Sequence, residues 1–345
     1  MPYLEINEVH EGRSEDLMLQ IEPNSVALSF WSPPYFVGKE YEKNETYEGW
    51  QAMLRAVITN HFRVLKPGGF LVINIADILC FKDEAIPRFQ ALNIASQKCD
   101  VTREMVIDAK AKHPNFSRYQ LAALLKCSEQ TIDRRLNGNN IRGGKHQTQT
   151  RVKLVGGALE DYAYAAGLYL YDKRIWIKDP AWANSQWTSN SLKAVSETED
   201  LYVFWKAGEF TIDRKKLTSD EWKEWGSRQT WFVDSVRRND DHEAKFPVDL
   251  AKRVIRLYTA EGDTVLDPFM GSGTTAIAAK VLGRNYLGIE KEAKYVRLAR
   301  NKVKHHITQT ELQNEIVLQK VEKTKKPAKK KARTGAVQPE LQLNT

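Results

Sequence analysis

The chain of 345 residues is poor in cysteine, and its three cysteines follow no recognisable pattern. Cys80, Cys99 and Cys127 form no CxxC pair and leave an odd count, which argues against a disulfide framework and against a zinc site. None of the seven histidines stands in a metal-ligand pattern. We therefore expect no bound metal.

The sequence also lacks the segments that mark a secreted or membrane protein. Residues 1–16 are polar and acidic, without the apolar stretch of a signal peptide. The most apolar run, Phe70 to Phe81, is interrupted by Asn74 and Asp77 and is too short to span a bilayer. These absences predict a soluble, reduced, cytoplasmic protein without a membrane partner.

Positive charge is concentrated at the C-terminal end. The formal net charge is +8, and the segment from Lys320 onward holds eight Lys or Arg against two Glu. The rest of the chain is therefore nearly balanced, so DNA affinity there requires a local basic face. Residues 311–345 are expected to form a basic disordered tail. It would add salt-sensitive attraction to DNA, and a purely solubilising end explains the same composition equally well.

The N-terminal part predicts a parallel βαβ unit. Ser25 to Phe30 is a short apolar run typical of a buried strand, and apolar residues recur at helical spacing from Tyr47 to Leu65. Lys66-Pro67-Gly68-Gly69 is expected to stop the helix and turn the chain. Phe70 to Ile75 then supplies the second strand.

The C-terminal part repeats this alternation. The pattern predicts helices at Leu250–Tyr258, Thr275–Leu282 and Val296–Ile307, and strands at Thr264–Leu266 and Asn285–Ile289. Together the two parts favour one doubly wound sheet over two independent domains.

A segment of different character separates the two parts. Met105 to Leu136 is helical by pattern, and two short helices joined near Lys126-Cys127-Ser128 would form a helix-turn-helix with Ser128 as the second N-cap. Basic residues follow closely and could contact phosphates or base edges, namely Arg134, Arg135, Arg142 and Lys145. A solvated charged surface explains the same cluster equally well.

The glycine-rich turn from Asp267 to Thr275 suits a nucleoside cofactor. Gly271 and Gly273 let the backbone approach a ligand, and the helix that follows offers unpaired N–H groups. The turn lacks the third glycine of a dinucleotide fingerprint and the lysine of a P-loop. Glu290 ends the next strand 19 residues after Gly271, near the spacing at which an acidic side chain takes ribose hydroxyls.

Ser32-Pro33-Pro34-Tyr35, after the first strand, suits a pocket for a planar amino group. An exocyclic amino nitrogen is a poor nucleophile because its lone pair is delocalised into the base. The Ser32 hydroxyl and the Pro33 carbonyl can accept its hydrogens and so localise the lone pair. The two prolines stiffen the loop, and Tyr35 offers a ring on which the base can stack. A base in a duplex can enter such a pocket only after it has flipped out of the helix.

These two motifs resemble those of the beta-class amino DNA methyltransferases, in which the catalytic motif precedes the S-adenosylmethionine motif. Ser32–Tyr35 is similar to the catalytic motif and Asp267–Thr275 to the cofactor motif. Arg63–Gly69 resembles the helix-end signature of the family, and His242–Pro247 resembles the segment that lines the cofactor pocket.

The resemblance implies an α/β fold with a doubly wound, mostly parallel sheet of seven strands in cyclically permuted order. It assigns residues 1–80 and 191–310 to the methyltransferase domain, with the catalytic and the cofactor motif respectively. Residues 81–190 would be a helical insertion that recognises DNA.

The resemblance also implies the roles of individual residues. Ser32, Pro33, Pro34 and Tyr35 would be catalytic. Cofactor contacts would come from Phe246, Pro247, Asp267, Pro268, Phe269, Gly271, Ser272, Gly273, Thr274, Thr275 and, through the ribose, Glu290. Arg13 stands where family members often carry an Asp that contacts the adenine, and whether Glu15 or Asp16 replaces that contact stays open.

Serine at position 32 is similar to the members that methylate cytosine N4, whereas adenine N6 members more often carry Asp or Asn. The expected activity is transfer of a methyl group from S-adenosyl-L-methionine to cytosine N4 of double-stranded DNA, by base flipping and without a metal. The expected setting is a restriction-modification or phage self-protection system in a bacterial or phage-infected cell, beside a separately acting restriction endonuclease. Adenine N6 methylation and an inert DNA-binding regulator are the alternatives.

Overall fold

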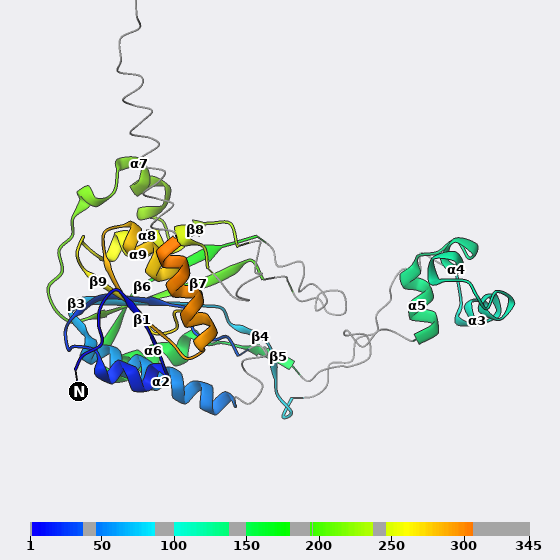
Figure 1. Cartoon of the computed structure of the whole chain (residues 1–345), viewed down its shortest axis with the longest axis horizontal. Coiled ribbons are helices and arrows are strands. Elements are labelled where there is room, and N and C mark those ends of the chain that lie inside the picture. The colour runs from blue at the N-terminus through cyan, green and yellow to red at the C-terminus, as the bar shows by residue number, and fades with distance from the viewer. Residues whose placement is uncertain are drawn as a thin grey trace, which may run out of the picture.

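Strands from both ends of the described chain join in one sheet. The computed structural model describes residues 2–36, 46–86, 100–137, 150–179, 194, 196–236 and 246–305. The sheet runs in the order β1-β10-β9-β2-β3-β7-β6-β8 (Figure 1). Its strands are β1 Glu8–Glu11, β2 Val26–Trp31, β3 Leu65–Ile75, β6 Leu168–Ile177, β7 Thr198–Lys206, β8 Thr230–Phe232, β9 Thr264–Asp267 and β10 Asn285–Glu290.

The sheet is mostly parallel, as expected. β1, β10, β9, β2 and β3 are mutually parallel, β7 is antiparallel to both β3 and β6, and β8 is parallel to β6. Among the described residues, this main sheet has eight strands rather than the seven that were expected. The edge strand β8 has only three residues, too few for a sequence pattern to reveal it.

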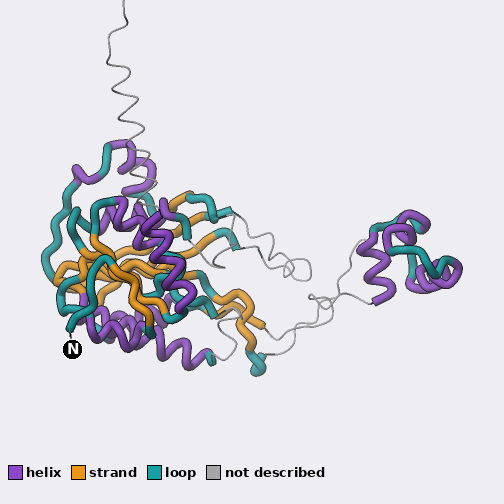
Figure 2. The backbone as a smooth tube through the Cα atoms, in the orientation of Figure 1, coloured by secondary structure: helices purple, strands orange, loops and turns teal. Residues whose placement is uncertain are grey.

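Helices cover both faces of the sheet (Figure 2). On one face, α2 (Tyr47–Val64) and α6 (Gly156–Ala165) pack on Trp31, Leu71 and Ile73. On the other, α8 (Val248–Tyr258), α9 (Thr274–Val281) and a helix over residues 293–305 pack on Leu28, Phe30 and Val72. The central strands are buried on both sides, which is why β2 is apolar apart from Ser29.

Short elements complete the body. They are α1 (Ser14–Leu17), α7 (Ser219–Glu221), the 3₁₀ turns Met18–Gln20 and Arg214–Lys216, and a π-helical turn at Trp222–Gly226. Within the described ranges, every helix is too short or too polar to cross a membrane.

The predicted turn at Lys66–Gly69 is instead a bulge inside β3. Helix α2 ends at Val64 and the chain enters the strand at once. The register of β2 and β3 then shifts from Val26 opposite Leu65 to Leu28 opposite Phe70, so the glycine segment loops out of the ladder. Gly68 has a φ of 78°, which only glycine adopts readily. The sequence signal therefore marked a break in the strand rather than a reversal of the chain.

The other predicted elements lie within two or three residues of the observed ones. The last helix begins at residue 293 instead of 296, and its expected end at Ile307 lies outside the described residues.

The central segment contains a small three-helix unit. Helices α3 (Arg103–Lys112), α4 (Arg118–Leu124) and α5 (Glu129–Asn137) bury Val106, Leu121 and Ile132 in a core of their own. Helices α4 and α5 lie where the sequence predicted the two helices of a helix-turn-helix. Ser128 Oγ accepts the Thr131 N–H at 3.2 Å, as expected of an N-cap.

The expected insertion boundary at residue 190 is too late. Strands β4 (Ile78–Lys82) and β5 (Thr150–Lys153) pair antiparallel in a separate two-stranded ribbon. After β5 the chain returns to the body, where α6 packs on α2 and β6 pairs with β7 in the main sheet. These two elements were assigned to the insertion because the segment has no motif that marks the return.

Acid should destabilise the body through His61. This side chain is fully buried, with Nδ1 2.7 Å from the Val57 carbonyl oxygen and Nε2 2.8 Å from Ser29 Oγ. Burial lowers the pKa of His61 from 6.5 to about 4, so below pH 6.5 the unfolded chain takes up the proton first. The thermal midpoint should therefore fall as the pH drops from 6.5 towards 4. In His61→Leu this component should be absent, and parallel pH curves for the two proteins would contradict the assignment.

Candidate active site

Four parallel strands end at the same edge of the sheet, and each is followed by residues of the site. β2 leads into Ser32, β9 into the glycine-rich turn, β10 ends in Glu290 and β1 leads into Gly12. Loops at the carboxyl ends of parallel strands are where α/β folds bind ligands. The motifs at 32 and at 267 become neighbours because β2 pairs directly with β9, Ser29 lying opposite Leu266.

The two motifs line one cleft that is partly open to solvent. Ser32, Pro33 and Pro34 form part of its wall. The cofactor motif contributes Pro268, Phe269, Gly271, Ser272 and Thr274, and Phe246 and Glu290 also line the cleft. Its further lining residues are Arg13, Ser14, Glu15, Trp50, Met53, Met270, Lys291, Glu292 and Tyr295.

Asp267 shapes the glycine-rich turn from below the cleft. Its carboxylate is 1% exposed, and its two oxygens accept the Phe269 N–H at 2.9 Å and the Thr275 hydroxyl at 2.6 Å. Neither Asp267 nor Thr275 lines the cleft, although both were expected to touch the cofactor. Each holds the ends of the turn together, which is a role the motif alone could not distinguish from ligand contact.

Glycine is needed at position 273 for two reasons. The residue has a φ of 92°, and a Cβ there would lie 3.2 Å from Cα and Cβ of Ala299 in the helix over residues 293–305. The turn therefore packs tightly on its neighbouring helix while its other side faces the cleft. Gly273 and Pro247, like Asp267 and Thr275, are not lining residues.

Glu290 braces the turn from β10. One carboxylate oxygen accepts the Gly271 N–H at 2.9 Å and the other accepts the Glu292 N–H at 2.9 Å. Burial raises the pKa of Glu290, and the two backbone hydrogen bonds partly offset this. Each oxygen keeps a second lone pair, so the carboxylate can still accept hydrogen bonds from two neighbouring hydroxyl groups of a ligand in the cleft.

The N-terminal segment forms a wall of the cleft that the motifs did not reveal. The Ser14 hydroxyl donates to the Pro268 carbonyl and so ties α1 to the cofactor motif. Arg13, which replaces the usual acidic residue, pairs with Glu15, its Nε lying 3.1 Å from the Glu15 carboxylate. Glu15 lines the cleft, whereas Asp16 does not.

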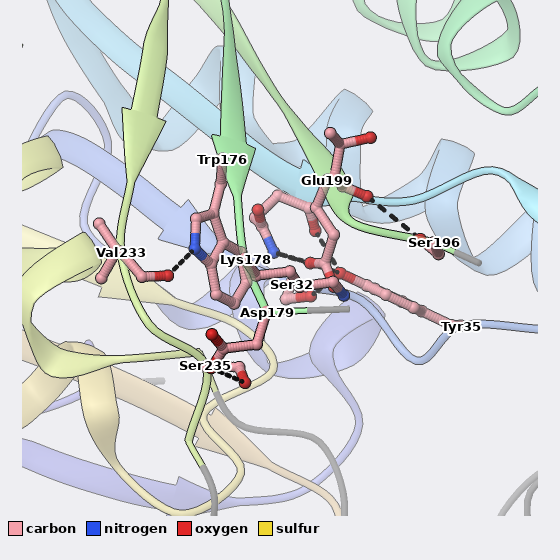
Figure 3. Close-up of polar contacts among 11 residues, drawn as sticks. Ser32, Tyr35, Trp176, Lys178, Asp179, Ser196, Glu199, Val233 and Ser235 are labelled. Atoms are coloured by element: carbon pink, nitrogen blue, oxygen red, sulfur yellow. Dashed lines mark hydrogen bonds and ion pairs between the residues drawn. The ribbon is translucent and has the colours of Figure 1, made fainter. Parts of the chain in front are cut away.

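The proline turn is held rigidly beside the cleft. Trp50 Nε1 donates to the Pro34 carbonyl at 2.7 Å, which fixes the loop against α2. The Ser32 hydroxyl donates to the Tyr35 hydroxyl at 2.9 Å (Figure 3). Tyr35 itself is not a lining residue, and its hydroxyl belongs to a polar cluster behind Ser32 with Asn74 and Glu199.

The expected DNA-binding residues divide into three cases. Arg135 donates from Nε to the Val101 carbonyl at 2.8 Å and so stabilises the three-helix unit internally. Arg134 lies on α5, while Arg142 and Lys145 lie outside the described residues.

Sequence reasoning missed Asn74, Lys178 and Glu199. Asn74 had been noted only as an interruption of an apolar run. Glu199 is 8% exposed although it is charged, and it lies on β7, a strand with an alternating burial pattern. A charged residue at an inward position of an alternating strand was the available signal.

The doubly wound sheet, with a glycine-rich turn and a proline turn on one cleft, is the α/β fold of the methyltransferases. A family model described as DNA methylase, of the N6/N4 group, matches residues 26–301, so the chain belongs to that family.

Two bacterial relatives and two solved structures frame this assignment. The chain is 60% identical over 301 residues to the type II methyltransferase M.BglI of Bacillus subtilis, covering 87% of this chain and 86% of that protein. It is 26% identical over 305 residues to M.BglII of the same species, covering 86% and 69%.

Among structures, the putative DNA modification methylase TTHA0409 of Thermus thermophilus, in complex with S-adenosyl-L-methionine, matches with a TM-score of 0.55 at 24% identity, covering 87% of this chain and 93% of that one. The cytosine-N4-specific PvuII DNA methyltransferase matches with a TM-score of 0.52 at 16% identity, covering 89% and 93%. At these identities the structures confirm the fold.

Asp267 should make stability depend on pH near neutrality. Burial raises the pKa of Asp267 from 3.8 to about 7, so the folded state holds a proton that the unfolded chain has already lost. The stabilisation is therefore complete below pH 3.8 and declines as the pH rises to about 7. Asp267→Asn lacks this titration. The thermal midpoint of the variant, relative to that of the wild type, should therefore rise as the pH increases from 4 to 7. A constant difference over that range would refute the assignment.

Proposed function

We propose that the protein is a site-specific DNA methyltransferase that acts on cytosine N4 in double-stranded DNA, with S-adenosyl-L-methionine as methyl donor. The observation that carries this proposal is one cleft that joins Ser32 to Gly271 and Glu290. Ser32 supplies an acceptor for an amino group, and the glycine turn with its carboxylate supplies a nucleoside site.

The residues of the cleft fit the cofactor. Phe246 and Phe269 are apolar walls, and Glu290 is a carboxylate whose oxygens each keep a second lone pair. The turn at Gly271 presents bare backbone to the cleft. S-adenosyl-L-methionine, when bound, supplies a methyl group activated by the positive sulfonium. Phe246 also packs on Phe30 with ring centroids 4.9 Å apart, which anchors that wall to β2.

Ser32 and the Pro33 carbonyl accept the two amino hydrogens and so localise the nitrogen lone pair towards the methyl donor. The bond from Trp50 to the Pro34 carbonyl keeps the turn in place as the base arrives. No covalent bond between enzyme and base is needed, because the nitrogen itself attacks. The base reaches this site by flipping out of the duplex.

The helix-turn-helix of α4 and α5 is the proposed reader of the DNA sequence. Its helices belong to a unit with its own core, so the surface of α5 can contact DNA without altering the cleft. The basic segment 311–345 adds sequence-independent attraction to phosphates.

The identity of 60% to M.BglI supports a place in a type II restriction-modification system of a bacterial or phage-infected cell. A restriction endonuclease that cuts the same site is the expected companion, acting separately in the cytoplasm.

Nucleoside analysis should distinguish the two amino targets. DNA methylated by this enzyme should yield N4-methylcytosine on mass spectrometry, and N6-methyladenine instead would overturn the choice of base while leaving the enzyme class intact. Ser32→Ala should lower kcat on the order of 10²-fold because one directed hydrogen bond in the transition state is lost. Its affinity for the cofactor should stay near that of the wild type, and incorporation of labelled methyl groups at the wild-type rate would remove Ser32 from catalysis.

Arg134→Ala should weaken DNA binding if α5 reads DNA. Loss of a base contact costs about 1–3 kcal/mol at one position of the site, whereas loss of a phosphate contact lowers the salt slope by about 1. Lys112→Ala is the matched control, since Lys112 is an exposed cation of the same unit that pairs with Asp108 on α3. Equal losses in both variants, measured by fluorescence anisotropy across salt concentrations, would count against a specific role for α5.

A further inference from the structure

A buried polar cluster stands directly behind Ser32. The Tyr35 hydroxyl lies 2.9 Å from Ser32 Oγ and 2.7 Å from Glu199 Oε2 (Figure 3). Asn74 Nδ2 donates to the same carboxylate oxygen at 2.7 Å and to the Tyr35 hydroxyl at 3.2 Å. Lys178 Nζ pairs with the other oxygen, Oε1.

The chemistry of these groups sets the direction of the hydrogen bonds. An ionised carboxylate only accepts, so the Tyr35 hydroxyl must give its single proton to Glu199. The alternative acceptor, the Asn74 backbone carbonyl, is farther away at 3.4 Å. With its proton committed, Tyr35 can only accept from Ser32. The Ser32 proton is thereby turned away from the cleft.

Lys178 and Asn74 hold the Glu199 carboxylate in a fixed orientation. Glu199 is 8% exposed, and a carboxylate at that depth persists as a charge only when it is paired and hydrogen-bonded. Lys178 follows the last residue of β6 and Glu199 lies near the start of β7, so the pairing of these strands brings the two side chains together.

The geometry points to Glu199 as a positioning residue that makes Ser32 an obligate hydrogen-bond acceptor towards the amino group of the target base. Because Ser32 Oγ gives its proton to Tyr35, both of its lone pairs are available, and one faces the cleft. A serine whose hydroxyl rotated freely could instead point its proton into the cleft, where it would repel the amino hydrogens of the base. This inference rests on the proposed role of Ser32 in amino methylation, and it holds for cytosine N4 and adenine N6 alike.

Glu199→Gln tests the direction with little change in shape. Lys178 only donates, so the amide oxygen of the new side chain turns to Lys178 and its NH₂ group faces Tyr35 and Asn74. Asn74 can accommodate this by turning its amide over, because its Oδ1 has no hydrogen-bond partner among the described residues. Tyr35 must then accept from this amide, which frees its proton for Ser32 and turns the Ser32 proton towards the cleft. We expect kcat to fall on the order of 10- to 100-fold, with an unchanged dissociation constant for S-adenosyl-L-methionine and a similar thermal midpoint.

A second change in the same cluster should restore activity. In Glu199→Gln with Lys178→Met, the amide can turn its oxygen to Tyr35 again, so kcat should recover at least severalfold over Glu199→Gln alone. Loss of the negative charge alone predicts no such recovery. Asp200→Asn is the matched control, because Asp200 also lies on β7, pairs with Lys173 at 2.9 Å and accepts the Tyr202 hydroxyl at 3.0 Å, away from Ser32.

Binding gives a readout independent of turnover. Once the recognition site has been mapped by sequencing of modified bases, two duplexes can be compared. One carries the target base, and in the other a carbonyl oxygen replaces the exocyclic amino group (uracil for cytosine, hypoxanthine for adenine). The wild type should bind the duplex with the amino group more tightly. Glu199→Gln should shift the ratio of affinities towards the duplex with the carbonyl oxygen, since the Ser32 proton then points at that oxygen.

The outcomes separate this inference from the proposed function. A wild type that methylates no amino group would defeat the proposed function, and the inference with it. A wild type that methylates normally, with Glu199→Gln equally active or with an unshifted ratio of affinities, would defeat the inference alone. Reduced kcat in Glu199→Gln without recovery in the double variant would also overturn it.

Discussion

The pairing of β2 with β9 is the interaction on which the rest of the structure depends. It places Ser29 opposite Leu266, so that two loops separated by more than half of the chain leave the sheet at adjacent points. Ser29 strengthens this junction, since its hydroxyl lies 3.2 Å from the Leu266 carbonyl and 2.8 Å from buried His61. A slip of one residue would exchange the faces of β2 and carry the proline turn away from the cofactor motif.

Much of the fold was predictable because its signals are local. Buried parallel strands read as apolar runs, and the helices between them show helical spacing, so the elements on both sides of the insertion were placed within a few residues. The alternation of strands and helices in both parts also indicated one joint sheet, and the family resemblance implied the same. The parts of the topology that no sequence motif marks were not predicted. The ribbon of β4 and β5, the return of the chain through α6 and β6, and the edge strand β8 depend on pairings that no short sequence pattern encodes.

The candidate site shows the same division. The residues of the two motifs that face the cleft were found because their residue types carry the chemistry. The motif could not show that Asp267 and Thr275 bond to each other beneath the turn instead of facing the cleft. Glu199 was missed because its partner Tyr35 lies on a distant segment, and Lys178 was missed because its role depends on its ion pair with Glu199. Proximity in space, rather than residue type, gives these two side chains their place behind Ser32.

The antiparallel ribbon of β4 and β5 has a consequence for how such enzymes diversify. Because Lys82 lies opposite Thr150, the polypeptide departs and comes back at adjoining points. A module of any length or architecture can be spliced there without disturbing the ladder of the main sheet, whose strands β3 and β6 lie on either side of the junction in sequence. With α4 and α5 as the proposed reader of DNA, exchange of the inserted segment would change target choice and leave the cleft unchanged, so the two properties could evolve separately.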